Sequence, residues 1–177
     1  WERVRHFLSE LVPVAEEAGV VLAAHPDDPP VDLLRGTPRL VNRPEKYDRL
    51  MGLVPSKANG LELCLGSLQE MPGGAICEHV RRCARSGRIG YIHFRNVKGK
   101  VPRYVESFVD DGDIDMAEIG RILRDEKYEG VLIPDHTPEM TCDASWHAGK
   151  AFALGYMRAL VQNAHALGPQ RRLEAAA

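Results

Sequence analysis

The sequence of 177 residues has little of what would indicate a membrane, nucleic-acid-binding or disulfide-rich protein. Its 25 acidic and 23 basic residues nearly balance, so no excess of one charge favours a nucleic-acid or anionic-membrane partner. No apolar run approaches the ~18 residues that a membrane span needs. Only four cysteines are present, and their spacing is typical of neither a disulfide framework nor a zinc ribbon. We therefore expect a globular protein that binds neither nucleic acid nor a membrane.

Glycine-rich phosphate-binding loops are also absent. Neither GxGxxG nor GxxxxGK[ST] occurs, which argues against a nucleotide cradle. No signal-peptide pattern opens the chain, and we expect a cytoplasmic protein. The first residues, WERVRHFLSEL, already look like the middle of a helix, so we expect that the natural start lies upstream.

What the sequence does contain is a regular alternation of helices and short apolar strands. Apolar spacing predicts helices over residues 1–18, 45–52, 73–87, 112–130 and 149–167. Short, nearly continuous apolar runs predict strands over residues 20–24, 61–65, 88–97 and 130–136. Such strands separated by helices favour an α/β fold with a parallel sheet that helices cover.

Four strand–helix units are too few to close a (β/α)8 TIM barrel. We therefore expect residues 1–167 to form the C-terminal half of such a barrel, with its N-terminal half absent, and residues 168–177 to form a flexible tail. An open half-barrel would leave two sheet edges and an apolar face bare. It would need a partner, either the missing half or another subunit, and we expect a homo-oligomer.

Each expected strand ends in a potential metal ligand. His25 and Asp135 end the first and fourth strands, Cys64 lies near the end of the second, and His93 lies in the third. One such residue alone is more often a packed core residue than a ligand. In a parallel barrel, however, the carboxyl ends of all strands converge on one face. Two imidazoles, a thiolate and a carboxylate there favour a shared site for a divalent transition metal.

Other reactive groups surround these four residues. His136 directly follows Asp135 and points in another direction, so it could face a substrate. Arg95 lies two residues after His93 on the same face of the expected strand. A guanidinium group there suits a substrate carboxylate, which it can bind through two parallel hydrogen bonds.

The two aspartates of the HPDDPP stretch follow His25 directly. Asp27 and Asp28 could orient the His25 ring as supporting residues of the metal site, or they could merely cap the loop. Both readings are open at this point. We include the two carboxylates among the candidate substrate-binding groups.

Six stretches, in this order, resemble the mannonate dehydratase family: GVVLAAHPDDPP, LRGTPRLV, ANGLELCLGS, YIHFRNV, DGDIDM and IPDH. The resemblance runs over almost the whole chain. It implies a barrel related to the xylose-isomerase-like enzymes, with Mn²⁺ or Fe²⁺ as cofactor. It also implies dehydration of a small sugar acid, D-mannonate, to 2-keto-3-deoxy-D-gluconate in hexuronate breakdown.

The resemblance also implies roles for single residues. The family's metal ligands fall on His25, Cys64, His93 and Asp135, its histidine next to the aspartate ligand on His136, and its strand arginine on Arg95. Two features depart from the family pattern: the second histidine of Asp-His-Gly-His is missing from DHTPEM, and the position of the catalytic tyrosine holds His147.

Dehydration of a 2,3-dihydroxy acid requires a base for the C2 proton and an acid for the C3 hydroxyl group. His136 and His147 would divide these roles. The departures keep two alternatives open: a sugar isomerase or epimerase of the same barrel superfamily, and a non-catalytic metal-binding barrel fragment.

Overall fold

The computed structural model describes residues 1–166 except residue 74, so the expected tail lies outside the described residues. Its main sheet is parallel and has the order β1 (Leu22–Ala24), β4 (Asn59–Cys64), β5 (Ile89–His93) and β8 (Val131–Ile133). The four expected strands therefore form the main sheet, each beside the next along the chain. This arrangement confirms the prediction of four successive units of a (β/α)8 barrel.

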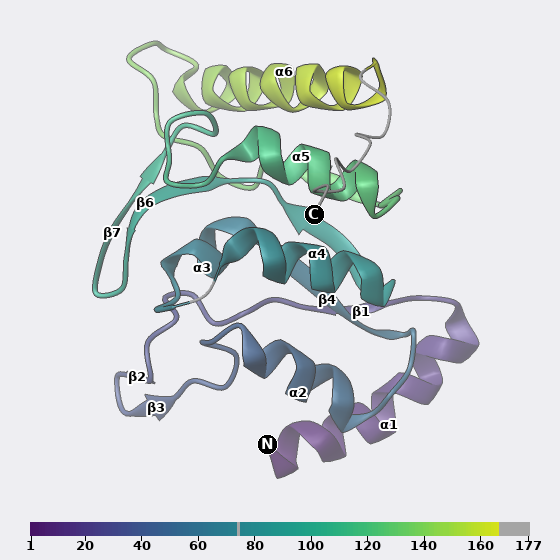
Figure 1. The fold of residues 1–177 in the computed structure, drawn as a ribbon. Coiled ribbons are helices and arrows are strands. Elements are labelled where there is room, and N and C mark those ends of the chain that lie inside the picture. Colours follow the sequence, from purple (N-terminus) through teal and green to yellow (C-terminus); the bar gives the residue numbers. More distant parts are fainter. Residues whose placement is uncertain (74, 167–177) are drawn as a thin grey trace, which may run out of the picture.

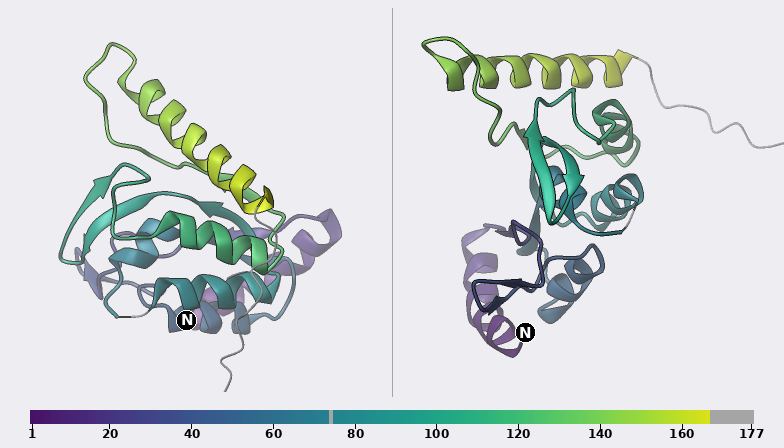
Figure 2. Two further views of the ribbon diagram at one scale, coloured as in Figure 1. Left: turned by 45° about the horizontal axis from the view of Figure 1, so that its top comes forward. Right: turned by 90° about the vertical axis from the view of Figure 1, so that its left-hand side faces the viewer.

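Helices alternate with these strands along the chain. They are α1 (Glu2–Ala18), α2 (Glu45–Leu53), α4 (Ile76–Ser86), α5 (Met116–Asp125) and α6 (Ser145–Ala166). Gly19 takes a left-handed conformation (φ 66°) directly after α1, a conformation that costs glycine little, and the chain turns there into β1. Figures 1 and 2 show α2, α4 and α5 in a row along the sheet, with α6 beside α5 at one end.

The core lies between the sheet and the row of helices. Leu61, Leu63 and Ile92 of the central strands are fully buried, and Ile119 and Ile122 of α5 are equally inaccessible. Regular apolar spacing on the helices and continuous apolar runs on the strands produce this core. None of the described helices is long and apolar enough to cross a membrane.

Three short elements were not expected from the sequence: helix α3 (Leu65–Glu70) and two antiparallel hairpins, β2 (Leu33–Leu34) with β3 (Thr37–Pro38), and β6 (Asn96–Lys100) with β7 (Arg103–Ser107). The third expected strand is confirmed as β5 (Ile89–His93), but its predicted end at residue 97 was wrong. Strand β5 ends at His93, and the chain enters the hairpin at Asn96. Arg95 consequently lies between two strands, which apolar spacing alone cannot reveal.

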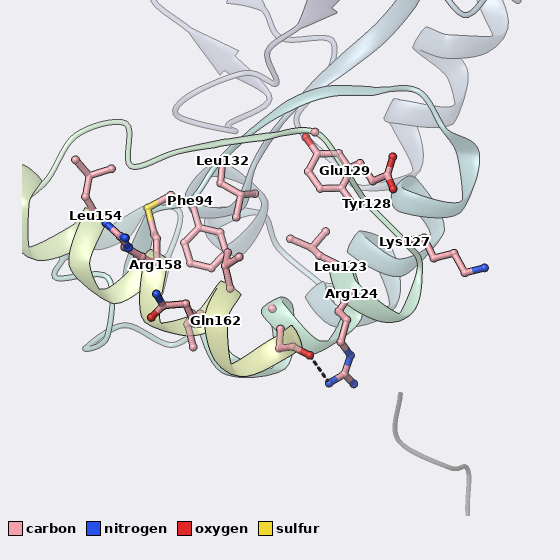
Figure 3. A pocket seen from close by; sticks show the side chains of 16 residues that line it. Phe94, Leu123, Arg124, Lys127, Tyr128, Glu129, Leu132, Leu154, Arg158 and Gln162 are labelled. Atoms are coloured by element: carbon pink, nitrogen blue, oxygen red, sulfur yellow. Dashed lines mark hydrogen bonds between the residues drawn. The ribbon is translucent and has the colours of Figure 1, made fainter. Parts of the chain in front are cut away.

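The two edge strands of the main sheet are unpaired on their outer side among the described residues. Strands β1 and β8 each have one neighbour, and the side chains of Val21 and Val131 beside or within them are 51% and 60% exposed. Next to β8, an apolar groove of about 910 Å³ lies between β8, α5 and α6 (Figure 3). The exposed apolar surface thus gathers partly at the end of the sheet where a closed barrel would continue.

Candidate metal centre

The carboxyl ends of three neighbouring strands bring three of the predicted ligands together. Cys64 and His93 are the last residues of β4 and β5 and are directly paired in the sheet. His25 directly follows β1, and its ring centroid lies 5.5 Å from that of His93. Strand direction and register are therefore what gather these side chains.

A fourth residue in this group, Glu62, was missed by the sequence analysis. One donor atom from each of His25, Glu62, Cys64 and His93 lies within 4.8 Å of the others. Glu62 precedes Cys64 by two positions and so shares its face of β4. The signal was present in the sequence, because a glutamate within the apolar run LELCL is unusual in a buried strand.

Asp135 lies beside this group rather than within it. Its Oδ2 atom is 3.4 Å from His93 Nδ1, and it also lies 3.2 Å from Arg95 Nε and 3.3 Å from His136 Nε2. The residue adopts a left-handed backbone conformation (φ 55°), which is uncommon outside glycine and recurs at functional sites. Its carboxylate thus lies next to the centre, and it also contacts the side chains of Arg95 and His136.

Two buried atoms of the centre lack a hydrogen-bond partner among the described residues. Glu62 Oε1 and His93 Nδ1 are 2.8 Å apart, yet they are not aligned for a hydrogen bond, and each is inaccessible to solvent. Buried polar atoms are almost always satisfied, so an unsatisfied pair requires an explanation. Nitrogen, sulfur and carboxylate donors of this kind fit a divalent transition metal that is shared between them.

The pKa shifts of the centre describe a thiolate paired with an imidazole, and a bound metal would have to displace the His25 proton. Burial raises the pKa of the Cys64 thiol, but hydrogen bonds to His25 and His93 and the nearby Arg95 charge outweigh burial and lower the pKa to about 5. Burial lowers the pKa of His25, whereas the contacts with Cys64 and the Pro26 carbonyl raise it to about 9. The site therefore favours a thiolate, the form of cysteine that binds metals.

Arg95 is buried, with 2% of its side chain exposed. Its guanidinium group contacts four carboxylates from separate segments of the chain, those of Asp28, Glu70, Glu106 and Asp135. A Cβ atom on Gly66 would overlap this group, so the glycine provides the space that it occupies. Arg95 thus connects the HPDDPP loop, α3, β7 and the loop after β8. Its predicted contact with a substrate remains a prediction.

The structure assigns different contacts to the two aspartates after His25. The Asp27 carboxylate accepts a hydrogen bond from the Val41 backbone N–H (2.6 Å) and pairs with Arg39 (3.0 Å). Asp28 pairs with Arg95 at 2.6 Å. Neither orients His25, whose Nδ1 atom lies 2.6 Å from the Pro26 carbonyl oxygen instead. Asp27 stabilises the loop, and Asp28 joins it to Arg95.

The two predicted acid–base histidines lie in different surroundings. His136 is 44% exposed and lies between Asp135 and Glu106, whose Oε2 atom is 3.7 Å from His136 Nδ1. His147 is exposed in the first turn of α6. Within the part of the chain that the structure describes, no hydrogen bond or ion pair connects His147 with the metal centre. His136 therefore borders the site through Asp135, and the role of His147 stays a prediction.

Comparison with known proteins identifies the family. The family model of D-mannonate dehydratase (UxuA) matches residues 1–167. The chain belongs to the mannonate dehydratase family. The expected resemblance is thereby confirmed, and the metal dependence of this family agrees with the donor set described above.

Several mannonate dehydratases show the extent of the match. Those of Geobacillus thermodenitrificans and Streptococcus uberis are 38% and 36% identical over 76% and 77% of this chain, but the match covers only 37% and 40% of their length. The crystal structure of the Streptococcus suis enzyme superposes with a TM-score of 0.83 at 30% identity, covering 100% of this chain and 53% of that one. The chain thus spans about half or less of these relatives.

Other solved structures share the fold at lower identity. An L-ribulose 3-epimerase has a TM-score of 0.67 at 17% identity, and a xylose isomerase-like TIM barrel protein from Mycobacterium smegmatis, solved in complex with magnesium, has 0.63 at 17%. These likenesses establish the barrel architecture alone.

Proposed function

We propose that this chain carries the metal centre of an enzyme that dehydrates D-mannonate to 2-keto-3-deoxy-D-gluconate. The observation that carries the proposal is the convergence of His25, Cys64 and His93 at neighbouring strand ends, within a chain of the mannonate dehydratase family. The N/S/O donor set suits Mn²⁺ or Fe²⁺. The family resemblance assigns the carboxylate ligand to Asp135, which lies 3.4 Å from His93.

A bound divalent cation would withdraw charge from the substrate carboxylate and 2-hydroxyl group and so make the C2 proton more acidic. His136 is the group best placed to move a proton, because it is partly exposed and borders the centre through Asp135. Such a positioned acid or base contributes typically 10²–10⁴-fold to a rate. His147 would share this work only if the start of α6 approached the site.

The substrate carboxylate would have to compete for Arg95. Glu70 is fully buried, but Asp28 and Glu106 are about one-third exposed (32% and 34%). We infer that a substrate carboxylate replaces one of these two partners on the guanidinium group. Asp28 would then be free to accept a hydrogen bond from a substrate hydroxyl group, while Asp27 holds the loop in place.

The proposal is tested by incubating the chain, loaded with Mn²⁺ or Fe²⁺, with D-mannonate. Formation of a 2-keto-3-deoxy acid supports it. Exchange of the C2 proton or inversion of a carbon without loss of water would instead indicate an isomerase or epimerase. Metal binding with neither reaction would indicate a non-catalytic barrel fragment.

We also propose that the open sheet edges are covered in the active enzyme. Exposed valines at both edges support a partner, either a preceding barrel half or a second subunit. The metal-binding thiolate of Cys64 must stay reduced, which favours the cytoplasm as the site of action.

A further inference from the structure

Glu62 is the member of the metal centre that the family resemblance does not assign. It lies within β4 between Leu61 and Leu63, both fully buried, and its own side chain is only 3% exposed. Burying a carboxylate costs free energy unless the group is paired or coordinates a cation. The atoms around Glu62 therefore indicate what compensates its charge.

The nearest of these atoms are ring nitrogens. Glu62 Oε1 lies 2.8 Å from His93 Nδ1 and Oε2 lies 3.5 Å from His25 Nε2. The shorter contact lacks the alignment of a hydrogen bond, and both of its atoms are buried and unsatisfied. The carboxylate is therefore directed at the imidazoles without being hydrogen-bonded to the nearer one.

The orientation of the His25 ring directs its other nitrogen at the carboxylate. Nδ1 lies 2.6 Å from the Pro26 carbonyl oxygen, and Nε2 lies 3.5 Å from Glu62 Oε2. Nitrogen atoms of both imidazoles, the Cys64 sulfur and a Glu62 oxygen all lie within 4.8 Å of one another. A single divalent cation among them would contact both imidazoles and the carboxylate together.

We propose that Glu62 is itself a ligand of the divalent metal ion, alongside His25, Cys64 and His93. This inference deepens the proposed function and rests on the metal centre proposed there. A thiolate and a carboxylate supply two negative charges, which balance a divalent cation in a buried site. Asp135 can add to this set but is not needed to complete four donors.

Zinc binding to the full 177-residue chain tests the proposal. Glu62→Gln keeps the size of the side chain and removes its charge, and we expect it to weaken Zn²⁺ binding by about 100-fold or more. Loss of a residue that only supports a ligand typically costs about 10–100-fold. The affinity is measured by competition with a chromogenic chelator, after circular dichroism has shown that the variant is folded.

Glu70→Gln is the matched control, because Glu70 is also a buried carboxylate but pairs with Arg95 and lies outside the group of donors. We expect it to retain nearly wild-type Zn²⁺ affinity. Equal affinities of the Glu62→Gln and Glu70→Gln proteins would overturn the role of Glu62 and leave the metal centre standing. Failure of the wild-type chain to bind Zn²⁺ would overturn both proposals.

A crystal structure of the Zn²⁺-loaded wild-type chain decides the matter even if the variant does not fold. We expect a Glu62 oxygen about 2.0–2.2 Å from the ion, the usual Zn–carboxylate distance. An ion bound by Cys64 and His93, with both Glu62 oxygens well outside that distance, would contradict the proposal.

Discussion

The metal centre and the groove beside β8 have neighbouring residues in the sequence but surroundings of different polarity. Around the centre, buried and partly buried charged side chains from many segments contact one another, with Arg95 joining four carboxylates. The groove is lined mainly by apolar side chains, among them Phe94 and Leu132 (Figure 3). Phe94 directly follows His93, so one step along the chain leads from the centre to the groove. The donors of the centre come from this chain, whereas the groove leaves apolar surface uncovered.

The largest expected effect is on the centre. Cys64→Ala removes the sulfur atom of the proposed metal centre, so bound metal, measured by inductively coupled plasma mass spectrometry, and dehydration should both fall to background. Cys77→Ala, in α4 and outside the group of donors, should leave both unchanged. Full metal content in the Cys64→Ala protein would show that the thiolate is not a ligand.

His136→Ala separates binding from chemistry. We expect the turnover of D-mannonate to fall by about 10²–10⁴-fold, as for loss of a general acid or base, while metal content stays at the wild-type level. His147→Ala should have a smaller effect, because His147 is exposed and has no hydrogen bond or ion pair with the described residues of the centre. Wild-type turnover in the His136→Ala protein would refute the assignment.

Substitutions in the groove should change the free energy of unfolding and leave metal binding unchanged. Leu123 of α5 lines it and is 5% exposed, so Leu123→Ala should lower the free energy of unfolding by about 2–5 kcal/mol. Val161→Ala, on the same groove but 42% exposed, should cost roughly 0.5 kcal/mol or less. Urea denaturation of the metal-loaded proteins measures both. Equal losses would show that the groove is filled by another segment.

The smallest change is expected at the sheet edge. Val131→Lys places a charge on β8 and should shift the chain from an associated form toward the monomer in sedimentation velocity. Val105→Lys on β7 is the control, since both valines are 60% exposed. A wild-type chain that is monomeric, stable and soluble would contradict the need for a partner.

Much of the fold follows from local patterns. Continuous apolar runs indicated the four strands, and helical spacing indicated the helices between them, because both patterns report burial directly. The hairpin β6–β7 escaped this reasoning, since NVKGK and RYVES carry no strong apolar alternation. Their pairing depends on contacts with the rest of the fold.

The candidate site was predictable where a residue type and a strand end coincide. His25, Cys64 and His93 met that condition, and the structure gathers them. Glu62 was missed because it lies two positions before Cys64, nearer the middle of its strand, although a glutamate in the apolar run LELCL is itself unusual. The four partners of Arg95 come from segments far apart in the sequence, so no spacing could reveal them.

The sequence by itself determined the alternation of strands and helices, the family, and the ligand-type residues at successive strand ends. Only the tertiary structure decided which carboxylate accompanies the two imidazoles and the thiolate, and that Arg95 is surrounded by carboxylates. The physical reason is that burial and periodicity are local properties of the chain. The distance between two charged groups depends instead on strand register and on loops from separate segments.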